Sequence, residues 1–528
     1  MPLRRWWERA REVPGAVMVR GLAVSTEEWT QAARDAAAGG GRLLSLWASE
    51  RHESPPAQSV YAAFLIEPGV LILALALTDA RSAALRAPGA DQPQYPGLEG
   101  TFPAAARLQR AAFDLSGVRS SDPDRRGWLR HGAWPVDFHP LERPAEPGST
   151  AAASPEPSRP YPFVRVAGEG VHEIAVGPVH AGTIEPGHFR FSVVGEKVLR
   201  LEEHLGYVHK GIERRFAELS LREGVRLAAR VSGDSAVAFS WAYCQALEGI
   251  CACAPPPRAL WLRALMLELE RIANHLGDLG ALGNDAGFAF GLAQFSRLKE
   301  QLLRGIHAAF GARYLLDALV PGGVAVDLSA GGAERLASLV ESLAAESVTL
   351  RAIYEDHSGL RDRLNGTGVL LPELAARLGV LGLVARASGQ PLDVRIDLPC
   401  APYAELAPLR IVRAAGDVAA RVTVRFEELA ESSRLVQRIL AVLPAGPCSV
   451  EPSEPPAGAF GVGLIEGWRG PVFVALESGP HGTLRRCHPH DPSWQNWPAL
   501  EHAILGNIVP DFPLINKSFN LSYSGADL

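Results

Sequence analysis

The stretch VGPVHAGTIEPGHFRFSVVGEKVLRLEEHLGYVHKGIERR, residues 176–215, contains the signals that decide the fold. Its first part clusters β-forming side chains around glycine and proline, which predicts the strands of a small sheet. From GIERRFAEL, residues 211–219, apolar residues recur every three to four positions, which is the period of a helix. The stretch therefore marks a change from a short β segment to a long helical one.

Helical periodicity then dominates the chain. It is clearest in WLRALMLELERIANHLGDLGAL, residues 261–282, and in GGAERLASLVESLAAESVTLRAIYED, residues 331–356. PAGPCSVEPSEPPAGAFG, residues 444–461, breaks the pattern, and GLIEGWRGPVFVAL, residues 463–476, predicts a returning hairpin. The region is therefore expected to be mostly helical, with some sheet.

A change in composition divides the chain. RPAEPGSTAAASPEPSRPYP, residues 143–162, replaces periodic apolar residues by proline, serine, alanine and glutamate, which is typical of a linker. We therefore predict an α+β protein: a small N-terminal α/β domain over residues 1–142, and a mostly α-helical domain with a small β-sheet over residues 163–528. In the first domain, SVYAAFLIEPGVLILALALTDA, residues 59–80, is split by Glu-Pro-Gly and predicts a two-stranded hairpin, not a membrane span.

Composition excludes some classes of function. The 528 residues carry a net charge of −6 and no run of lysine and arginine with interleaved aromatics, so we expect no nucleic-acid partner. The six cysteines form no Cys-x-x-Cys pair, which argues against a thiolate metal site and suits a reducing cytoplasm. No apolar segment follows MPLRRWWERAREVPG, residues 1–15, so we expect no signal peptide and membrane contact only through partners.

Motifs of the second domain resemble a known family. The stretch 176–215 is similar to the opening of the large subunit of membrane-bound, group 4 (hydrogenase-4-like) nickel-iron hydrogenases, and of the related 49-kDa-type subunit of respiratory complex I. The resemblance implies a hydrogenase-large-subunit-like fold over residues 163–528. Further similar motifs follow in the family's order: LELERIANHLGDLGALGNDAGFAFG (267–291), DRLNGTGVL (362–370), GDVAARVTVRFEELAESSR (416–434) and GLIEGWRGPVFVALESG (463–479).

The first domain has a resemblance of its own. LQRAAFDLSGVRSSDPDRRGWLRHGAWP, residues 108–135, resembles the signature of the 30-kDa-type subunit of complex I, which is often fused to the 49-kDa type. That family usually has Glu-Arg-Glu and His-Pro-Asp where this chain has Gln-Arg-Ala at 109–111 and Asp-Pro-Asp at 122–124. The resemblance implies a complex I 30-kDa-like domain over residues 1–142.

Four thiolates of the hydrogenase family are missing. Two Cys-x-x-Cys pairs bind the metals in that family, and the resemblance places the early pair at Ser232 and Ser235 in ARVSGDSAVAF, residues 229–239. It places the late pair at Ser522 and Gly525. Soft thiolates suit nickel and low-spin iron, whereas a neutral hydroxyl is a hard and weak donor. We therefore predict that the nickel-iron centre is absent, that the chain binds no metal, and that it is not by itself an active nickel-iron hydrogenase.

Complex I subunits lack the same thiolates and use the emptied cavity for the quinone headgroup. A tyrosine of the early motif and a histidine of the first glycine-rich loop hold the quinone oxygens there. The tyrosine position corresponds to Gly233 here, and the histidine to either His180 or His188. The resemblance thus implies a quinone cavity, with an apolar slot, hydrogen-bond donors and a proton source. Its catalytic residues would be His180, His188 and Glu203, and its lining residues Arg230, Ser232, Gly233, Ser235, Ser518 and Ser522.

Each of these roles has an alternative. The histidines could instead satisfy buried carbonyl groups, and the serines could fill a vestigial cavity. For EEHLGYVH, residues 202–209, we favour surface ion pairing with basic residues 210–215 over proton transfer. ELERIANH, residues 268–275, predicts an ion pair that packs helices, and HPHD, residues 488–491, predicts a solvated loop rather than a metal site.

The resemblance also implies partners and a location. We expect an iron-sulfur small subunit of the complex I type that holds the cluster, hydrophobic membrane-arm subunits, and a cytoplasmic position on the inner face of the cell membrane. No G-x-G-x-x-G fingerprint lies between a strand and a helix, so NADH chemistry would occur on another subunit. The hypothesis is a subunit of a complex I-related oxidoreductase that reduces quinone; the alternative is a redox-inert scaffold or coupling subunit of an ion-translocating membrane complex.

Overall fold

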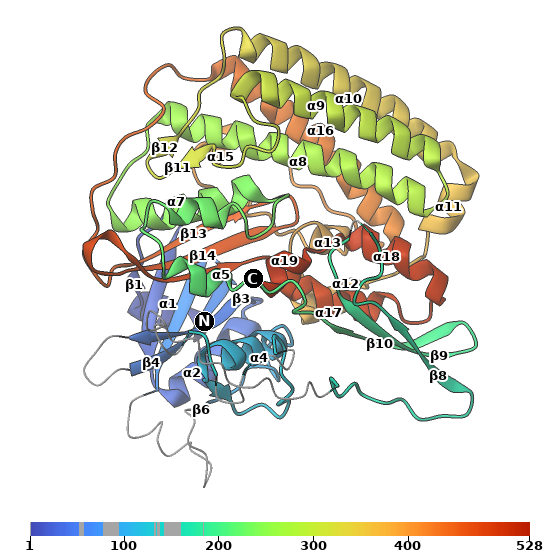
Figure 1. Cartoon of the computed structure of the whole chain (residues 1–528), viewed down its shortest axis with the longest axis horizontal. Coiled ribbons are helices and arrows are strands. Elements are labelled where there is room, and N and C mark those ends of the chain that lie inside the picture. Colours follow the sequence, from blue (N-terminus) through green and yellow to red (C-terminus); the bar gives the residue numbers. More distant parts are fainter. Residues whose placement is uncertain are drawn as a thin grey trace.

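The computed structural model describes residues 2–51, 57–77, 94–130, 134, 138–141, 160–182 and 184–528. Figure 1 shows an N-terminal sheet at the lower left, long helices across the top, and strands β13 and β14 between them. Several small mixed or antiparallel sheets accompany a large group of helices, which confirms the α+β class. Residues 143–159 of the predicted linker lie outside the described residues.

The N-terminal region is built around a five-stranded mixed sheet in the order β1-β2-β5-β4-β3. Strands β2 and β5 run parallel, and the other neighbours are antiparallel. The predicted hairpin is confirmed, because β4 and β5 pair across a turn at Glu67 and Pro68. The elements are α1 (Pro2–Arg9), β1 (Arg11–Glu12), β2 (Val19–Val24), α2 (Thr26–Ala38), β3 (Arg42–Arg51), β4 (Ala57–Ile66), β5 (Gly69–Ala76), β6 (Gln94–Tyr95), α4 (Ala105–Ser116) and β7 (Arg119–Ser120).

The small sheet predicted for the start of the second region is also confirmed. Strands β8 (Val171–Val176), β9 (His188–Val194) and β10 (Lys197–His204) form an antiparallel sheet in the order β10-β9-β8. The loop between β8 and β9 is the glycine-rich segment that contains His180. The sheet therefore holds both ends of this loop in place.

Long helices make up most of the second region. The longest, α8 (Pro257–Asp285), begins with a proline at its first helical position, where no backbone N–H is needed. It packs against α9 (Ala289–Phe310) and α16 (Val418–Val442), and α10 (Gly332–Asp356) packs on both of these. Among the described helices, none is long and apolar enough to span a bilayer. The shorter elements are α5 (Ile212–Phe216), α6 (Gly224–Ala228), β11 (Leu319–Val320), β12 (Gly323–Val324), α11 (Ser358–Leu364), α12 (Pro372–Leu378), α13 (Gly382–Ala387), α14 (Val394–Asp397), α15 (Tyr403–Leu406), α17 (Ser493–Ala503), α18 (Phe512–Phe519) and α19 (Tyr523–Asp527).

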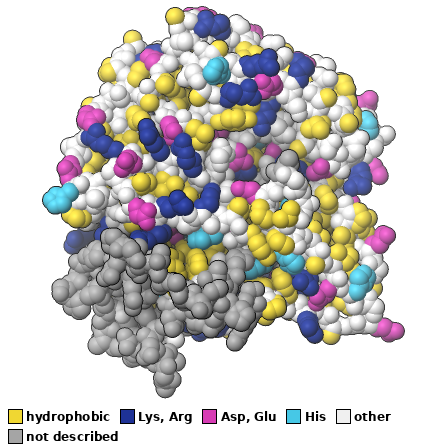
Figure 2. All heavy atoms as spheres, in the orientation of Figure 1, with side chains coloured by type: hydrophobic (Ala, Val, Ile, Leu, Met, Phe, Trp, Pro, Cys, Tyr) yellow, Lys and Arg dark blue, Asp and Glu magenta, His cyan; other side chains and the backbone are white. Residues whose placement is uncertain are grey.

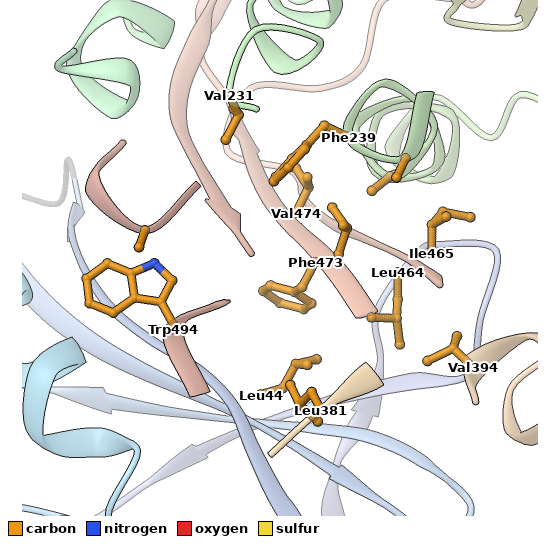
Figure 3. Close-up of a cluster of buried hydrophobic side chains, with 14 of the residues drawn as sticks. Leu44, Val231, Phe239, Leu381, Val394, Leu464, Ile465, Phe473, Val474 and Trp494 are labelled. Carbon is orange, nitrogen blue, oxygen red and sulfur yellow. The ribbon is translucent and has the colours of Figure 1, made fainter. Parts of the chain in front are cut away.

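A second antiparallel sheet joins the two regions. It contains β13 (Phe460–Glu466), β14 (Pro471–Ser478) and β15 (Leu484–His490), so the predicted hairpin over 463–476 is confirmed. Helix α7 (Ala236–Ile250) packs on one side, and Gly463 allows this, since a Cβ there would lie 1.8 Å from the carbonyl oxygen of Ala242. Figure 3 shows Phe473 of this sheet among apolar side chains that include Phe239 of α7 and Leu44 of β3.

The prediction of a solvated loop for HPHD is wrong. His488 and His490 lie on strand β15, and both are buried. Ser45 of β3 contacts His488 Nε2 at 2.8 Å and His490 Nδ1 at 3.1 Å, while Glu213 contacts His488 Nδ1 at 2.5 Å. Histidines that face a hydroxyl and a carboxylate can be buried, so polarity alone gave a misleading signal here.

Buried polar contacts also cross the junction between the two regions. Arg107 of α4 contacts Glu203 of β10 at 2.5 Å, and Arg42 of β3 donates to the carbonyl oxygen of Val380 at 2.5 Å. Buried apolar side chains of both regions belong to one continuous core. The two regions are therefore in extensive contact, whatever the structure of the segment that links them.

We expect limited proteolysis to cut first within residues 143–162, because their composition supplies few side chains that pack. The two pieces should stay associated after the cut, since the junction buries ion pairs and apolar side chains. Mass spectrometry of the first fragments and size-exclusion chromatography of the nicked protein measure both outcomes. First cleavage elsewhere contradicts the linker, and separation of the pieces in buffer contradicts the junction.

Candidate functional site

A cavity of about 580 Å³ lies where five segments of the chain meet. They are the β8–β9 loop, the turn at residues 232–235, the C-terminal end of α8, Arg469 in the β13–β14 turn, and the segment 512–524. In Figure 1 this is the region in which α18 and α19 approach the sheet β8–β10. The volume lies within the range of pockets that bind small organic molecules.

Contacts to the backbone fix the turn at residues 232–235. The carbonyl oxygen of Asp234 accepts hydrogen bonds from Trp468 Nε1 at 2.9 Å and from Asn274 Nδ2 at 2.8 Å. Helix α7 follows the turn, and its first N–H groups, at 237–238, donate to the Glu270 carboxylate. A carboxylate suits this place because the N-terminal end of a helix carries unsatisfied donors and a partial positive charge.

Residues at the former ligand positions of the early and late motifs meet in space. The hydroxyls of Ser232 and Ser522 are 2.8 Å apart, although the residues are far apart in sequence. Ser232 also donates to Asp234 Oδ1 at 2.8 Å, and Ser522 accepts from the Gly525 N–H at 2.9 Å. The convergence that the family resemblance implied is thus present, with hydroxyls in place of thiolates.

An ion pair forms one wall of the cavity. Arg469 donates to both carboxylate oxygens of Asp234, at 2.7 and 2.6 Å, and to the carbonyl oxygen of Asn520 at 2.6 Å. Burial opposes ionisation of Asp234, but the guanidinium holds the pKa of this carboxyl below its usual value. The carboxylate is therefore an acceptor at neutral pH.

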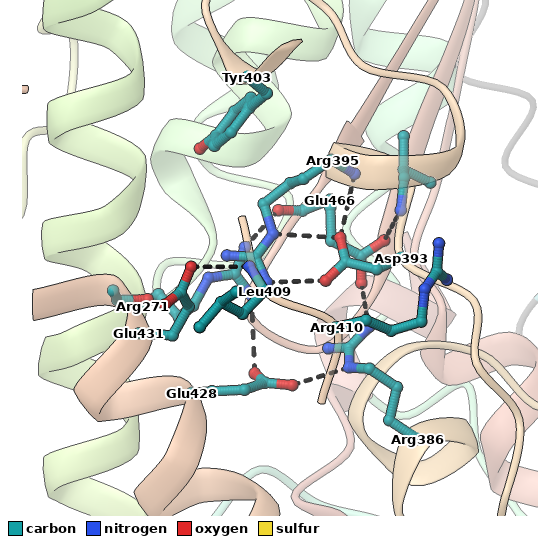
Figure 4. Close-up of polar contacts among 12 residues, drawn as sticks. Arg271, Arg386, Asp393, Arg395, Tyr403, Leu409, Arg410, Glu428, Glu431 and Glu466 are labelled. Atoms are coloured by element: carbon teal, nitrogen blue, oxygen red, sulfur yellow. Dashed lines mark hydrogen bonds and ion pairs between the residues drawn. The ribbon is translucent and has the colours of Figure 1, made fainter. Parts of the chain in front are cut away.

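A buried network of arginines and carboxylates fixes the segment that carries Arg469 (Figure 4). Arg271 of α8 donates to the carbonyl oxygens of residues 466 and 467, at 2.6 and 3.0 Å. Arg386 bridges the carboxylates of Glu428 on α16 and Glu466 on β13, each at 2.7 Å. Two long helices and the β13–β14 turn are thereby held together directly behind the cavity.

The ion pair expected within residues 268–275 belongs to this network. Glu268 contacts Arg271 at 3.3 Å, which confirms the prediction that these residues pack helices. Glu268 also accepts from Tyr403 at 2.7 Å, and His275 Nε2 contacts Glu428 at 3.0 Å. The role of the segment is therefore to connect α8 with α16 and the loops beside it.

Tyr523 also lines the cavity, although no sequence motif predicted it. Tyr523, at the start of α19, places its hydroxyl 3.1 Å from His180 Nε2, and both side chains line the cavity. Burial lowers the pKa of His180 and raises the pKa of Tyr523, so both side chains are neutral at pH 7. The position of Tyr523, directly after Ser522 of the late motif, was the signal that could have identified it.

Some predicted site residues do not line this cavity. Of the two candidate histidines, His180 lies in it, whereas His188 packs against Phe163 with ring centroids 5.0 Å apart. Ser232, Gly233 and Ser522 line it. The remaining lining candidates bind other groups: Arg230 pairs with Asp317 at 2.6 Å, Ser235 contacts Arg469 at 3.4 Å, and Ser518 contacts Arg421 at 2.8 Å.

Glu203 has a different environment from the one expected. The surface ion pairing predicted for residues 202–209 is wrong, because Glu202 and Glu203 are buried and bind arginines of the N-terminal region. Arg126 contacts Glu202, and Arg107 contacts Glu203, each at 2.5 Å. Burial raises the pKa of Glu203 well above its usual value. The junction excludes water from both carboxylates, so each needs an arginine of the N-terminal region as its partner.

A second, apolar hollow of about 260 Å³ lies on the other side of the turn. Gly233 and Asp234 line both this hollow and the larger cavity. Tyr314 and Leu316 line the hollow and are also exposed at the surface. The turn thus separates the larger cavity, whose wall includes charged side chains, from an apolar surface depression.

Apolar side chains are also exposed beside the mouth of the cavity. Val179, directly before His180, is 81% exposed, and Ile184 of the same loop lines the cavity. Figure 2 shows basic and acidic side chains interspersed over the helical part of this face, with hydrophobic side chains gathered toward the sheet β8–β10 and α18. Exposed apolar groups of this kind are typical of a surface that a partner covers.

The residues at the former ligand positions do not fit a nickel-iron centre. Two hydroxyls, Ser232 and Ser522, hydrogen-bond to each other, and all six cysteines lie at other positions. A Cβ on Gly525 would lie 2.7 Å from Asp491 Oδ2, so a cysteine has no room there. In the described part of the chain, no group of three or more His, Cys, Asp or Glu side chains could hold a metal ion.

Comparisons with known proteins agree with the motifs. A family model described as respiratory-chain NADH dehydrogenase, 49 Kd subunit, matches residues 285–459. Formate hydrogenlyase subunit 5 of Escherichia coli (strain K12) is 31% identical over 443 residues, which span 83% of this chain and 78% of that protein. An NADH-quinone oxidoreductase subunit of Bacteroides thetaiotaomicron is 27% identical over 407 residues, 74% of this chain and 76% of that protein.

A solved structure is similar as well. It is the membrane-bound sulfane sulfur reductase, an archaeal respiratory membrane complex. One of its chains superposes with a TM-score of 0.64 at 25% sequence identity, and the match covers 68% of this chain and 99% of that one.

Two glycines of the cavity motifs allow a test of the packing. Gly525→Ala should lower the free energy of unfolding by about 1–3 kcal/mol, because the added methyl group would contact Asp491 Oδ2 at 2.7 Å and Ser522 Oγ at 2.9 Å. Gly233→Ala is the control, since a Cβ there meets no atom within 4 Å. Its effect should stay within about 0.5 kcal/mol. Denaturant unfolding measures both variants, and equal losses would contradict this packing.

We also expect the purified complex to contain no stoichiometric nickel, because hydroxyl groups cannot replace four thiolates as ligands. Elemental analysis of the assembled complex measures the metal directly. One nickel per chain would show that ligands other than those at the family's positions bind the metal.

Proposed function

The chain belongs to the family that contains the large subunits of group 4 nickel-iron hydrogenases and the 49-kDa-type subunits of complex I, and on this basis we propose that its cavity binds and reduces a quinone. The reaction would occur in an assembled, membrane-associated oxidoreductase complex. Electrons would come from an iron-sulfur cluster in a partner subunit, and the protons from groups of this chain. The chain would act as the subunit that shapes the acceptor site.

The pair formed by His180 and Tyr523 carries this proposal. A neutral imidazole and a phenol together hold one N–H and one O–H proton, and the 3.1 Å contact between them uses one of the two. With the proton on Nε2, His180 donates to Tyr523 and the phenol O–H stays available to a ligand. A hydrogen-bond donor beside apolar side chains is what a quinone carbonyl requires. Tyr523 thus supplies from the C-terminal segment the phenol that the early motif lacks at Gly233.

The turn at Gly233 and Asp234 supports a route for electrons. The apolar hollow with the exposed Tyr314 and Leu316 offers a surface on which an iron-sulfur subunit would bury apolar area. A cluster docked there would be separated from the cavity only by the turn at Gly233 and Asp234. We therefore place the electron donor on the side of the hollow and the acceptor on the side of the larger cavity.

The exposed loop supports a position beside a membrane arm. Val179 and Ile184 are exposed next to the cavity mouth, where a hydrophobic partner subunit would cover them. A quinone is itself apolar, so its entrance would open toward the membrane. We propose that the chain is peripheral on the inner face of the cell membrane and is attached there through these partners.

A second class of acceptor, a small anionic one such as a polysulfide, comes from the comparison and not from the charge of the cavity. Lys517 and Arg469 line the cavity, but the carboxylates of Glu185, Asp234 and Asp285 line it too, so its wall carries no excess of positive charge. The solved relative is described as a sulfane sulfur reductase. A polysulfide is therefore the acceptor to compare with a quinone in the same assay.

The alternative to an electron-transferring subunit is a redox-inert scaffold. It is favoured by the absence of a side chain at Gly233, which leaves one wall of the cavity without the family's phenol. This alternative predicts that the partner small subunit has lost its cluster-binding cysteines. The sequence of that subunit, read for those cysteines, separates the two possibilities.

We expect His180→Ala and Tyr523→Phe each to weaken binding of a quinone analogue by about threefold or more, because each removes one member of the donor pair. Titration of the assembled complex with the analogue, followed by the spectra of its clusters, measures the affinity. Folding should be unchanged, since both side chains border the open cavity.

His172→Ala is the matched control. His172 is exposed on β8 and does not line the cavity, so its removal should leave the affinity within about twofold of the parent value. Lack of saturable binding in the parent complex would refute the quinone proposal. Binding that is equally tight in all four proteins would refute the role of the His180–Tyr523 pair.

A further inference from the structure

One tryptophan packs against Tyr523 behind the cavity wall. The rings of Trp497, on helix α17, and Tyr523 meet edge to face, with centroids 4.8 Å apart and an angle of 64° between their planes. Contacts of this geometry are attractive beyond the area that they bury. Trp497 is 1% exposed and does not line the cavity, so it touches Tyr523 but no molecule that the cavity holds.

The same helix also holds the backbone directly before Tyr523. The indole Nε1–H of Trp497 donates to the carbonyl oxygen of Ser522 at 3.3 Å, and the N–H of Ser522 donates to Ser493 Oγ at 2.9 Å. Ser493 and Trp497 are four residues apart on α17, so they lie on one face of the helix. This face therefore binds both backbone polar groups of Ser522, and Trp497 contacts the residues on both sides of the Ser522–Tyr523 peptide bond.

Helix α17 is itself fixed by the N-terminal region. Gln495 Nε2 donates to the carbonyl oxygens of residues 43 and 44 on β3, at 3.2 and 2.8 Å. Glu501 accepts from Arg107 of α4 at 2.8 Å. Because these contacts hold the helix on either side of Trp497, its side chain stands on a fixed support. The N-terminal region thus contributes to the site, although none of its described residues lines the cavity.

A second aromatic residue holds the partner of Tyr523. Phe189 of β9 is buried, and its ring centroid lies 5.5 Å from that of His180. It also lies 6.2 Å from the centroid of Trp497 and 6.5 Å from that of Tyr523. Phe189 and Trp497 thus back the His180–Tyr523 pair together. A change at Trp497 would move the phenol, whereas His180 would keep its contact with Phe189.

We infer that Trp497 is a positioning residue for Tyr523, which sets the place and the direction in which the phenol meets the acceptor in the cavity. This inference rests on the proposed function. A hydrogen bond weakens steeply when its donor is misaligned, so the direction of the phenol O–H decides how much it contributes to binding. The indole ring fixes the phenol ring, and the indole N–H fixes the backbone that carries it.

Trp497→Phe is the test variant, because it keeps an aromatic ring and removes the N–H that binds the Ser522 carbonyl oxygen. Trp29→Phe is the matched control. Trp29 is also buried, donates from Nε1 to a backbone carbonyl oxygen, at 3.1 Å, and meets a tyrosine ring edge to face. It lies on α2 and does not line the cavity. A loss that comes only from a weakened core would therefore appear in both variants.

The measurement is a double-mutant cycle in the assembled complex, which is titrated with decylubiquinone and followed by the spectra of its clusters. We expect Trp497→Phe to weaken binding by about threefold, and by no more than Tyr523→Phe does. In the Tyr523→Phe background the same change should alter the affinity by less than about 1.5-fold, because the hydroxyl through which Trp497 acts is already absent. Trp29→Phe should stay within about 1.5-fold of the parent.

Ser493→Ala is the second variant, for the case that Trp497→Phe does not assemble. It removes the acceptor of the Ser522 N–H and leaves every ring in place, so it loosens the same backbone from the same face of α17. Its loss of affinity should likewise be confined to proteins that contain the Tyr523 hydroxyl. A loss of equal size in the Tyr523→Phe background would overturn the inference.

The outcomes separate this inference from the proposed function. A parent complex without saturable binding refutes both. Saturable binding together with equal losses for Trp497→Phe in the two backgrounds refutes only the inference, because Trp497 would then act on the cavity without Tyr523. An affinity that Trp497→Phe leaves unchanged, or that Trp29→Phe lowers equally, also refutes only the inference.

Discussion

The structure depends on one buried network of arginines and carboxylates. Arg271 of α8 holds the backbone at residues 466 and 467, and Arg386 joins the carboxylates of Glu428 and Glu466. These groups are almost completely buried, so each charge needs its partners. Removal of one member of such a network typically costs about 3–5 kcal/mol, because the remaining charges stay buried and unpaired. The network fixes the β13–β14 turn, and this turn places Arg469 against Asp234.

The position of the cavity wall follows from that network. Its chemistry follows from the hydroxyl groups that stand at the thiolate positions of the hydrogenases. Ser232 and Ser522 meet at 2.8 Å because the turn before α7 and the segment before α19 are both fixed. Thiolates at such positions would hold a soft metal, whereas hydroxyls donate and accept hydrogen bonds. The same wall therefore offers hydrogen-bonding groups in place of soft metal ligands. Gly233 and Gly525 supply the space: one opens the cavity, and the other accommodates Asp491.

Some of the structure could be predicted from patterns and some could not. Periodicity predicted the long helices, and the Glu-Pro-Gly signal predicted the β4–β5 hairpin, because both are local properties of the chain. Polarity gave a wrong prediction for residues 488–491 and for the polar residues 202–204, which were expected at the surface and are buried. Their partners, Ser45 and Arg107, come from the N-terminal region. A local sequence pattern does not indicate a hydrogen-bond or ion-pair partner that is hundreds of residues away or across a domain junction.

The sequence by itself determined the family, the order of the motifs and the loss of the thiolates, since these depend only on which residue occupies each position. It also determined that glycine occupies position 233, where the tyrosine of complex I subunits binds the quinone. Only the tertiary structure decided which histidine lines the cavity and which tyrosine accompanies it. His180 and Tyr523 are 343 positions apart in the chain and 3.1 Å apart in space. Their contact depends on the packing of the β8–β9 loop against α19, and burial in that packing lowers the pKa of His180 and raises the pKa of Tyr523.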